Sequence, residues 1–290
     1  MKLSIVIRCR NEARFLADVF QALQAQRCNF PWEVVVVDNE SNDNTLELCR
    51  TMGAKSVSIA TTEFTYGRAL NLGIRNASGE LVLLLSSHSL PIGSSFLQDA
   101  IAPFDDSKIA AARCLMIGNS DQIAQWYRPR DIYYESSDEQ SLAETGMSWL
   151  GDYPTAGCCV LRRRVWEEVP FDEKLEANED KLWASKVLSL GYRVRCCSGA
   201  VWLYTRKRSK AAERNRRMRE HISLYRINGR PPMSIAEFFF RSLRACFAAP
   251  WVALRHVLDN VMWNYTLVTI PLRAKKQPHT GSFHEFKSQP

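Results

Sequence analysis

The sequence predicts an α/β fold, in which a mostly parallel central sheet is flanked by helices and followed by a helical C-terminal extension. Apolar, β-rich runs alternate with helical patterns through the first ninety residues, which favours parallel strands joined by right-handed crossovers. Two of these runs, at 34–37 and 81–85, are apolar without alternation, as is typical of strands buried on both faces. From Ser209 onward the pattern is helical throughout.

The elements can be placed in order along the chain. We expect strands at 3–9, 33–38, 56–60 and 80–86, with helices between them at about 14–26, 45–52 and 67–76. Residues 119–156 are polar, aromatic and irregular, and a stretch of this length without periodicity is typical of a functional excursion. Order resumes at Gly157, with a helix at about 178–190 and a strand at 193–197.

Composition bounds the class of protein. Hydrophobic residues make up 46% of the 290 residues, enough for a well-buried core. The nine cysteines include adjacent pairs at 158–159 and 196–197, a spacing that fits neither a disulfide framework nor a zinc site. The apolar run at 3–7 is too short for a signal peptide, and no stretch reaches the length of a membrane span. We therefore expect a cytoplasmic protein with reduced, buried thiols.

The net charge of +7 is distributed unevenly. Residues 203–230 hold ten Lys and Arg against two acids, a net of +8, and residues 231–290 hold seven against three, a net of +4. Residues 1–202 therefore carry 21 basic and 26 acidic residues, a net of −5. A basic tail on an acidic body indicates an anionic surface or ligand near the C-terminal third.

The tail also mixes aromatic with basic residues, and two interpretations of it stay open. Helices of this kind can lie at a membrane interface, which would give peripheral contact with the inner face of the plasma membrane. Packing against the preceding α/β domain or a second subunit, as in a homo-oligomer, explains the same pattern without lipid.

Polar side chains follow the predicted strands at 8–12, 38–43 and 86–91. Ligands of parallel α/β sheets bind beyond the carboxyl ends of the strands, so these three segments are the candidate site. Their short polar side chains can read a base and a ribose by hydrogen bonds. Asn44 or Thr45 can also serve only to cap the next helix, and this alternative applies to the 42–45 segment taken alone.

Four ordered motifs resemble glycosyltransferase family 2, whose members are inverting enzymes with the nucleotide-sugar-binding fold called GT-A. The motifs are an apolar strand ending in Asn11-Glu12, the pattern Asp38-x-x-Ser41-x-Asp43-x-Thr45, the segment 64–73, and the strand 80–85. The segment 64–73 is especially similar to the bacterial rhamnosyltransferase-type branch. Arg8 stands where a proline is common in the family. The resemblance covers about residues 3–200.

The resemblance implies a nucleoside diphosphate sugar as donor, with UDP or dTDP as the nucleotide. Asp38 would contact the uracil or thymine and the ribose, with Asn11 and Glu12 nearby. Arg68 and Asn71 would lie toward the diphosphate, where a guanidinium can make paired hydrogen bonds. The predicted donor-binding residues are Arg8, Asn11, Glu12, Asp38, Ser41, Arg68, Asn71, Ser86, Ser87 and His88.

Ser86-Ser87-His88 stands where the family normally has Asp-x-Asp, the pair of carboxylates that holds Mg²⁺ or Mn²⁺ against the diphosphate. We expect His88 to be a metal ligand in the third position, and imidazole suits Mn²⁺ better than Mg²⁺. The alternative is that His88 donates a hydrogen bond to the diphosphate directly. A cationic stretch at 206–210 would then help the diphosphate to depart.

On the acceptor side, the resemblance makes Asp180 the general base, because the family has a Phe-Asp-Glu turn followed by Glu-Asp at a helix start, as at 171–180. A carboxylate within about 3 Å of an acceptor hydroxyl can remove its proton as the glycosidic bond forms. Glu179 and Trp183 are the predicted acceptor-binding residues.

We therefore predict a GT-A catalytic domain at 1–205, with a nucleotide-binding half at 1–91 and an acceptor half at 92–205, and a basic helical extension at 206–290. The predicted function is inverting transfer of a hexose or deoxyhexose to a glycan or lipid-linked acceptor hydroxyl in bacterial surface polysaccharide synthesis. The alternatives are a non-catalytic GT-A scaffold and a nucleic-acid-binding protein that uses 206–230. No recognisable nucleic-acid-binding motif is present, and the lack of a glycine-rich loop after the first strand argues against a dehydrogenase.

Overall fold

The chain forms two units in a computed structural model that describes residues 2–117, 132–134, 155–206, 209–228, 234, 236, 238–240, 261–267 and 269–270. The first unit contains the described residues up to Lys174 together with Glu179–Arg206. The second contains Leu175–Asn178 and the described residues after Arg206. Most of the expected excursion at 119–156 lies outside the described residues.

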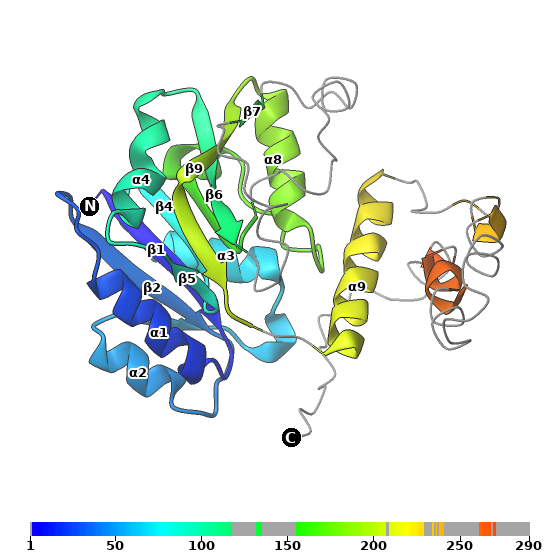
Figure 1. Cartoon of the computed structure of the whole chain (residues 1–290), viewed down its shortest axis with the longest axis horizontal. Helices are drawn as coiled ribbons and strands as arrows, with labels where there is room; N and C mark the ends of the chain where they lie inside the picture. The colour runs from blue at the N-terminus through cyan, green and yellow to red at the C-terminus, as the bar shows by residue number, and fades with distance from the viewer. Residues whose placement is uncertain are drawn as a thin grey trace. The chain divides into compact units, whose positions relative to one another are not determined.

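A nine-stranded mixed sheet forms the centre of the first unit, with the strand order β3-β2-β1-β4-β8-β6-β9-β5 and with β7 paired to β9 (Figure 1). Its strands are β1 (Leu3–Cys9), β2 (Trp32–Asp38), β3 (Lys55–Ser58), β4 (Leu81–Ser86), β5 (Ser89–Pro91), β6 (Ile109–Ile117), β7 (Ile132–Tyr134), β8 (Cys158–Arg162) and β9 (Arg193–Tyr204).

The helices of this unit are α1 (Ala13–Gln24), α2 (Thr45–Thr51), α3 (Tyr66–Arg75), α4 (Phe96–Ile101), α7 (Arg163–Glu168) and α8 (Glu179–Ser189), with 3₁₀ turns η1 (Thr61–Glu63) and η2 (Ala102–Asp105). The predicted fold class, α/β with a GT-A arrangement, is confirmed. The sheet is mixed, however, because β8 runs antiparallel to both β4 and β6. The parallel part, β3-β2-β1-β4, is the part that the alternating sequence pattern predicts.

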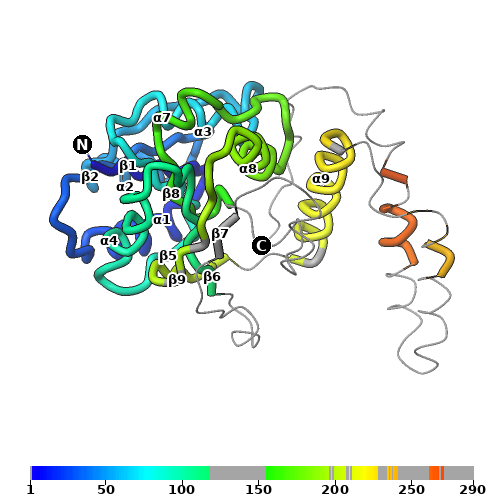
Figure 2. Tube along the Cα trace, turned by 90° about the horizontal axis from the view of Figure 1, so that it is seen from above, coloured from blue at the N-terminus to red at the C-terminus, as the bar shows by residue number. Residues whose placement is uncertain are grey.

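Helices cover both faces of the sheet, because both faces of its strands are apolar. Successive side chains of β1 illustrate this. Ile5 and Ile7 point into one apolar cluster with α1 and α4, whereas Val6 points into a second cluster with α3, α7 and α8. Figure 2 shows α1 and α4 on one side of the sheet and α3 and α7 on the other. Each fully buried Ile or Val contributes roughly 1.5–3 kcal/mol, so the sheet is held firmly from both faces.

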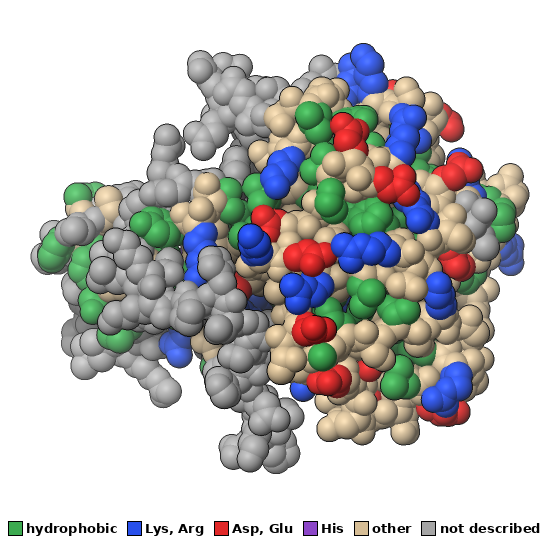
Figure 3. Space-filling model, turned by 180° about the vertical axis from the view of Figure 1, so that it is seen from behind, with side chains coloured by type: hydrophobic (Ala, Val, Ile, Leu, Met, Phe, Trp, Pro, Cys, Tyr) green, Lys and Arg blue, Asp and Glu red, His purple; other side chains and the backbone are tan. Residues whose placement is uncertain are grey.

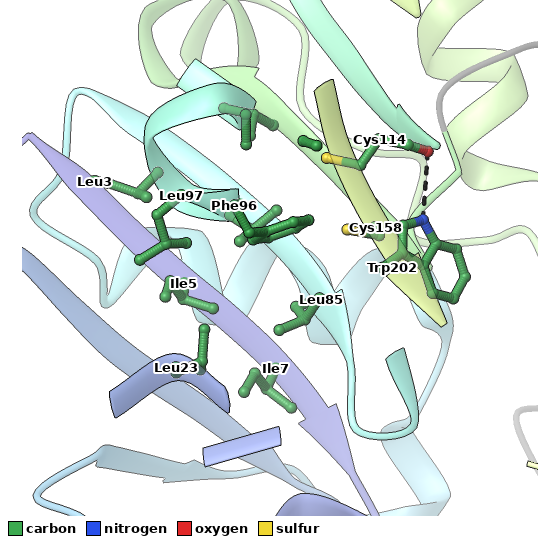
Figure 4. Packing of buried hydrophobic residues seen from close by; sticks show 14 of the residues in the cluster. Leu3, Ile5, Ile7, Leu23, Leu85, Phe96, Leu97, Cys114, Cys158 and Trp202 are labelled. Carbon is green, nitrogen blue, oxygen red and sulfur yellow. Dashed lines mark hydrogen bonds between the residues drawn. The ribbon is translucent and has the colours of Figure 1, made fainter. Parts of the chain in front are cut away.

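The first of these clusters extends to β6 and β8. Figure 4 shows Phe96 and Leu97 of α4 packed between the side chains of β1 and the buried thiols of Cys114 and Cys158. The Trp202 indole N–H donates to the Cys114 carbonyl at 3.3 Å. Cys9, Cys28, Cys49, Cys114, Cys158, Cys159 and Cys197 are free thiols, of which only Cys28 is not buried.

The second unit is organised around α9 (Lys210–Asn228). Ile222 of α9 packs with Leu267 and Ile270, and Tyr225, Phe238 and Trp263 lie against this cluster. Within the described parts of the chain, no helix combines the length and the apolar character that crossing a bilayer requires.

Candidate active site

The candidate site lies at one edge of the sheet, where β1, β2 and β4 all end. The pairing register sets Cys9 beside Asp38 and Arg8 beside Ser86. On the other flank of β4, the Ser86 N–H donates to the Gly157 carbonyl at 2.9 Å. The three polar segments that follow the predicted strands are therefore neighbours in space.

The loops after β1 and β2 are tied together by hydrogen bonds. The Asn11 N–H donates to Ser41 Oγ at 2.9 Å, and the Asn42 N–H donates to Asn11 Oδ1 at 2.8 Å. The Glu12 N–H donates to Thr45 Oγ1 at 3.0 Å. Asn11 and Ser41 therefore hold the two loops in one arrangement, and Thr45 joins this network besides starting α2.

Three non-glycine residues in the described chain have a positive φ, and all three lie in segments of the predicted site. Asn11 has φ 53° and Glu40 has φ 51°, one in each donor loop, and Asn178 has φ 61° directly before α8. Side chains make the left-handed region costly, so such residues persist where the surroundings enforce them, commonly at functional sites.

Asp38 is almost fully buried, with 1% of its surface exposed. One carboxylate oxygen accepts the Ser41 N–H at 3.0 Å, and the other accepts the Cys9 thiol at 3.7 Å. Burial, and then the Asp38 charge, raise the pKa of the Cys9 thiol well above its ordinary value. Asp38 thus shapes the loop that begins at Ser41, and each oxygen keeps a lone pair for a further donor.

Asp180 lies close to the end of β4. Its Oδ2 accepts the Ala156 N–H at 2.8 Å, and Ala156 immediately precedes Gly157, which bonds Ser86. Its Oδ1 accepts the Lys181 N–H at 2.8 Å. The first turn of α8 thus presents this carboxylate at the positive end of the helix dipole.

Glu179 is buried and paired with Arg8. Arg8 NH1 lies 3.7 Å from Glu179 Oε1, and the guanidinium stacks over the Tyr66 ring with its central carbon 4.8 Å from the ring centroid. Burial, and then the neighbouring Asp180 charge, raise the pKa of Glu179 to about 7, while Arg8 opposes this rise. Arg8 NH1 is buried without a hydrogen-bond partner, so the pair is an ion pair without a direct hydrogen bond.

Arg68 and Asn71, predicted to lie toward the diphosphate, are bound to the turn at 171–173 instead. Asn71 is 1% exposed; its Oδ1 accepts the Trp166 indole N–H at 2.9 Å, and its Nδ2 donates to Glu173 Oε1 at 2.9 Å. Arg68 Nε donates to Glu173 Oε2 at 3.2 Å. The Asn71 amide therefore has no free end for a donor, whereas the half-exposed Arg68 keeps part of its guanidinium available.

Glu173 is a structural residue that the sequence did not single out. Besides Arg68 and Asn71 it accepts from Arg75 NH2 at 3.1 Å. These donors outweigh partial burial and lower the pKa of Glu173. The sequence signal that could have indicated this role is the position of Glu173 in the Phe-Asp-Glu turn, together with the two arginines, Arg68 and Arg75, on α3.

Trp183, predicted to contact the acceptor, also lies inside the fold. It is 3% exposed, its indole N–H donates to the Val169 carbonyl at 2.5 Å, and its ring centroid lies 5.5 Å from that of Phe171. A sugar could not stack on this ring without displacing Phe171. The residue holds α8 against the turn that precedes it.

The end of β4 does not suit a hard divalent cation. Ser86 Oγ lies 3.1 Å from His88 Nε2, so the hydroxyl and the imidazole share a hydrogen bond, and the His88 ring packs edge-on against Tyr204 with centroids 5.1 Å apart. Ser87 is buried. Neither carboxylate of the usual pair is present, and the described residues contain no cluster of three His, Cys, Asp or Glu that could hold a metal ion.

A cation from the end of β9 reaches the loop after β1. Arg206 NH1 donates to Glu12 Oε1 at 2.7 Å, and Glu12 is 7% exposed. Lys207 and Arg208, the next members of the predicted cationic stretch, lie outside the described residues, as does the side chain of Lys210. On the face shown in Figure 3, the described basic and acidic side chains of the first unit are interspersed and form no broad basic surface.

Comparison with known proteins identifies the family. Residues 4–169 match Glycosyl transferase family 2. The chain belongs to this family. It is 24% identical over 208 residues to the O-antigen chain rhamnosyltransferase RfbN of Salmonella typhimurium, covering 69% of this chain and 65% of that protein. It is 25% identical over 217 residues to the poly(ribitol-phosphate) β-N-acetylglucosaminyltransferase TarS of Staphylococcus aureus, covering 72% of this chain and 36% of that protein.

Solved structures share the fold. The mannosyltransferase PcManGT of Pyrobaculum calidifontis, determined with GDP-Man and Mn²⁺, matches with a TM-score of 0.65 and 18% identity, over 95% of this chain and 87% of that one. TarS of S. aureus with UDP-GlcNAc matches with a TM-score of 0.56 and 19% identity, over 91% of this chain and 72% of that one. The family 2 chain described here therefore has the architecture of glycosyltransferases that bind nucleotide sugars.

Proposed function

We propose that this family 2 protein is an inverting glycosyltransferase that moves a hexose or deoxyhexose from a nucleoside diphosphate sugar to a hydroxyl of a bacterial surface glycan or glycolipid. The observation that carries this proposal is the position of Asp180. Its carboxylate is held by the N–H of Ala156, two residues before the strand β8 that flanks β4, at the edge where the donor loops end.

Asp180 is the general base. It takes the proton of the acceptor hydroxyl while that oxygen bonds to the anomeric carbon, and the bond to the nucleoside diphosphate breaks on the opposite face. The Ala156 N–H orients the carboxylate, which lies in the first turn of α8. Glu179 is the preceding residue. Its carboxylate accepts a hydrogen bond from a second hydroxyl of the acceptor sugar.

The donor binds along the loops after β1, β2 and β4. Asp38, Asn11 and Ser41 bind the base and ribose, since hydrogen bonds join these three residues into one polar network at the edge. Glu12, Arg8 and the remaining exposed part of Arg68 flank it. Ser86, Ser87 and His88 donate hydrogen bonds to the diphosphate, and Arg206 adds positive charge beside Glu12.

No step of this mechanism is assigned to a metal ion. Mn²⁺ or Mg²⁺ accompanies the nucleotides in solved relatives, but hydroxyls and one imidazole are a poor donor set for a hard cation. His88 therefore acts through hydrogen bonds rather than as a metal ligand, which is the second of the two roles that the sequence left open for it.

RfbN is an O-antigen chain rhamnosyltransferase and TarS is a poly(ribitol-phosphate) β-N-acetylglucosaminyltransferase, and both names support a surface-polymer acceptor. The TarS structure with UDP-GlcNAc supports a UDP-linked donor, and a dTDP-linked donor is the alternative. The second unit supplies peripheral membrane contact or a subunit contact, the two roles that its aromatic and basic composition supports.

The first experiment measures donor binding and transfer. Thermal unfolding is followed with UDP, dTDP and GDP sugars, each with and without Mn²⁺, because a ligand of the folded state raises its apparent stability. Transfer from the best donor is then measured to a panel of octyl hexosides. Asp180→Asn should lower kcat about 10²–10⁴-fold with donor binding intact.

Asp18→Asn is the matched control, since Asp18 is an exposed acid of α1. Full transfer by Asp180→Asn would remove the base assignment. Salt-sensitive binding of DNA or RNA without affinity for any sugar nucleotide would instead favour the nucleic-acid alternative.

A further inference from the structure

The turn that leads into α8 belongs to the second unit, although α8 itself belongs to the first. Leu175–Asn178 is grouped by its contacts with α9, and Glu179 follows it in the chain without an intervening residue. The residues proposed for catalysis and acceptor binding, Asp180 and Glu179, therefore start from a backbone that α9 contacts.

Three side-chain links join α9 to this turn, and each involves a different residue of the turn. Arg226 NH1 pairs with Glu176 Oε1 at 3.1 Å, and the Ser223 hydroxyl donates to the Ala177 carbonyl. Asn178 Nδ2 donates to the Glu220 carbonyl at 2.8 Å. Glu220, Ser223 and Arg226 are spaced three residues apart, so they follow one face of α9.

The links are buried and specific. Ser223 is 1% exposed and Asn178 is 6% exposed, and the Arg226 side chain is 16% exposed. A serine in the middle of a helix often bonds back to its own helix, but Ser223 donates to another segment. This face of α9 is matched to the turn and is not a solvated basic surface.

Asn178 connects the contact between α9 and the turn 175–178 to the start of α8. Its φ of 61° places it in the left-handed region immediately before the first turn of α8. Its amide donates to α9, so the hydrogen bond holds the residue in the left-handed conformation that sets where Glu179 and Asp180 begin. Catalytic geometry is sensitive to displacements of about 1 Å, which can cost about a hundredfold in rate.

We propose that α9 is a positioning element of the transferase, in which Ser223, Arg226 and Asn178 hold the turn 175–178 and thereby orient Asp180. The C-terminal extension then takes part in transfer, in addition to any membrane or subunit contact. The role rests on the proposed function, because orienting Asp180 matters only if Asp180 is the base.

The test uses the full-length chain and four variants. Ser223→Ala removes the hydroxyl, Arg226→Glu reverses the charge that pairs with Glu176, and Arg226→Glu with Glu176→Arg restores the pair in the opposite sense. Arg217→Glu is the control, because Arg217 carries the same charge on α9 but is 59% exposed and bonds Glu213 within the helix. Thermal unfolding confirms that each variant is folded at the assay temperature.

Ser223→Ala and Arg226→Glu should lower kcat about 10- to 100-fold while donor affinity stays within about twofold. The acidic limb of the pH profile of kcat should shift in both, since the surroundings of Glu179 change. The exchanged pair should recover most of the rate, and Arg217→Glu should match the wild type. Unchanged kcat in Ser223→Ala and Arg226→Glu, with the wild type active, overturns the positioning role alone.

Hydrogen exchange of the substrate-free protein tests, independently of activity, whether α9 holds the turn 175–178. Amides of residues 177–185 should exchange faster in Ser223→Ala, with those of β1 and β2 unaffected. Unchanged exchange at 177–185 overturns the proposal. A wild type that binds none of the sugar nucleotides and transfers nothing overturns the proposed function instead, and the exchange result then still decides whether α9 holds the turn.

Discussion

Replacing Arg8 by methionine would remove the only cation paired with the buried Glu179 carboxyl among the ion pairs of the described residues. Methionine keeps an unbranched apolar stem but is shorter than arginine and carries no charge. Glu179 has a pKa of about 7, and Arg8 holds it down against burial and the charge of Asp180. The variant should therefore raise the pKa of Glu179 further.

The size of the rise follows from the distance between the charges. Two unit charges 3.7 Å apart interact by about 4.5 kcal/mol at an effective dielectric constant of 20, which corresponds to about 3 pKa units. Water that enters the vacated space would reduce this figure. We expect the pKa of Glu179 to rise by about one to three units above about 7.

The assay is the pH profile of kcat. If ionised Glu179 holds the acceptor, the wild type should have an acidic limb near pH 7, and Arg8→Met should move this limb upward by at least about one unit. Transfer at pH 7 would fall about fivefold or more and recover at higher pH. Arg14→Met, which removes an exposed charge from α1, is the control.

Stability supplies a second readout. The pKa of Glu179 is about 7 in the folded state and about 4.5, its ordinary value, in the unfolded state. The folded state therefore binds the proton more tightly, and the free energy of unfolding should fall as the pH rises from about 4.5 to about 7. The loss is up to about 3 kcal/mol, and Glu179→Gln should remove this dependence. A limb that stays in place in Arg8→Met, together with lost donor affinity, would refute the reasoning and make Arg8 a donor contact only.

Three further predictions concern the surroundings of the site. Glu173→Gln should lower the free energy of unfolding by about 1–3 kcal/mol in urea titrations, because the carboxylate accepts from Arg68, Asn71 and Arg75; an unchanged midpoint would mean that this cluster is not stabilising. Asn71→Ala should cost about 2–4 kcal/mol, since it leaves the Trp166 indole N–H unpaired, and donor affinity measured at a temperature where the variant is folded should be unchanged. His88→Ala should weaken donor binding about tenfold equally with and without Mn²⁺, whereas a loss seen only with Mn²⁺ would restore His88 as a metal ligand.

The strands β1 to β4 and the helices between them were predictable because the local sequence pattern of each segment indicates its secondary structure. The run 3–9 coincides with β1, and continuous valines and leucines mark β2 and β4 as strands buried on both faces. The strands β6 and β8 were not predicted, because their partners are distant in sequence. Cys158–Arg162 pairs with β4 across more than seventy residues, and nothing in its composition shows the direction of that pairing.

The candidate site was predictable at the level of backbone position and less so for side chains. Residues after strand ends meet at one edge because parallel register requires it, so Arg8, Asp38 and Ser86 are neighbours. Which way a helical side chain points depends on what it packs against. Asn71 and Trp183 lie inward because their polar groups find the carbonyls of Phe171 and Val169, and one sequence alone does not show those partners.

The hydrogen bonds between the loops after β1 and β2 have a thermodynamic consequence. Asn11, Ser41 and Thr45 already fix both loops without a ligand, so a nucleotide arriving there has little backbone freedom left to remove. Nucleotide binding should therefore carry only a small penalty in conformational entropy, which isothermal titration calorimetry would measure. Ser41→Ala would free the Asn11 amide, and its lost affinity should appear mainly as a less favourable entropy of binding.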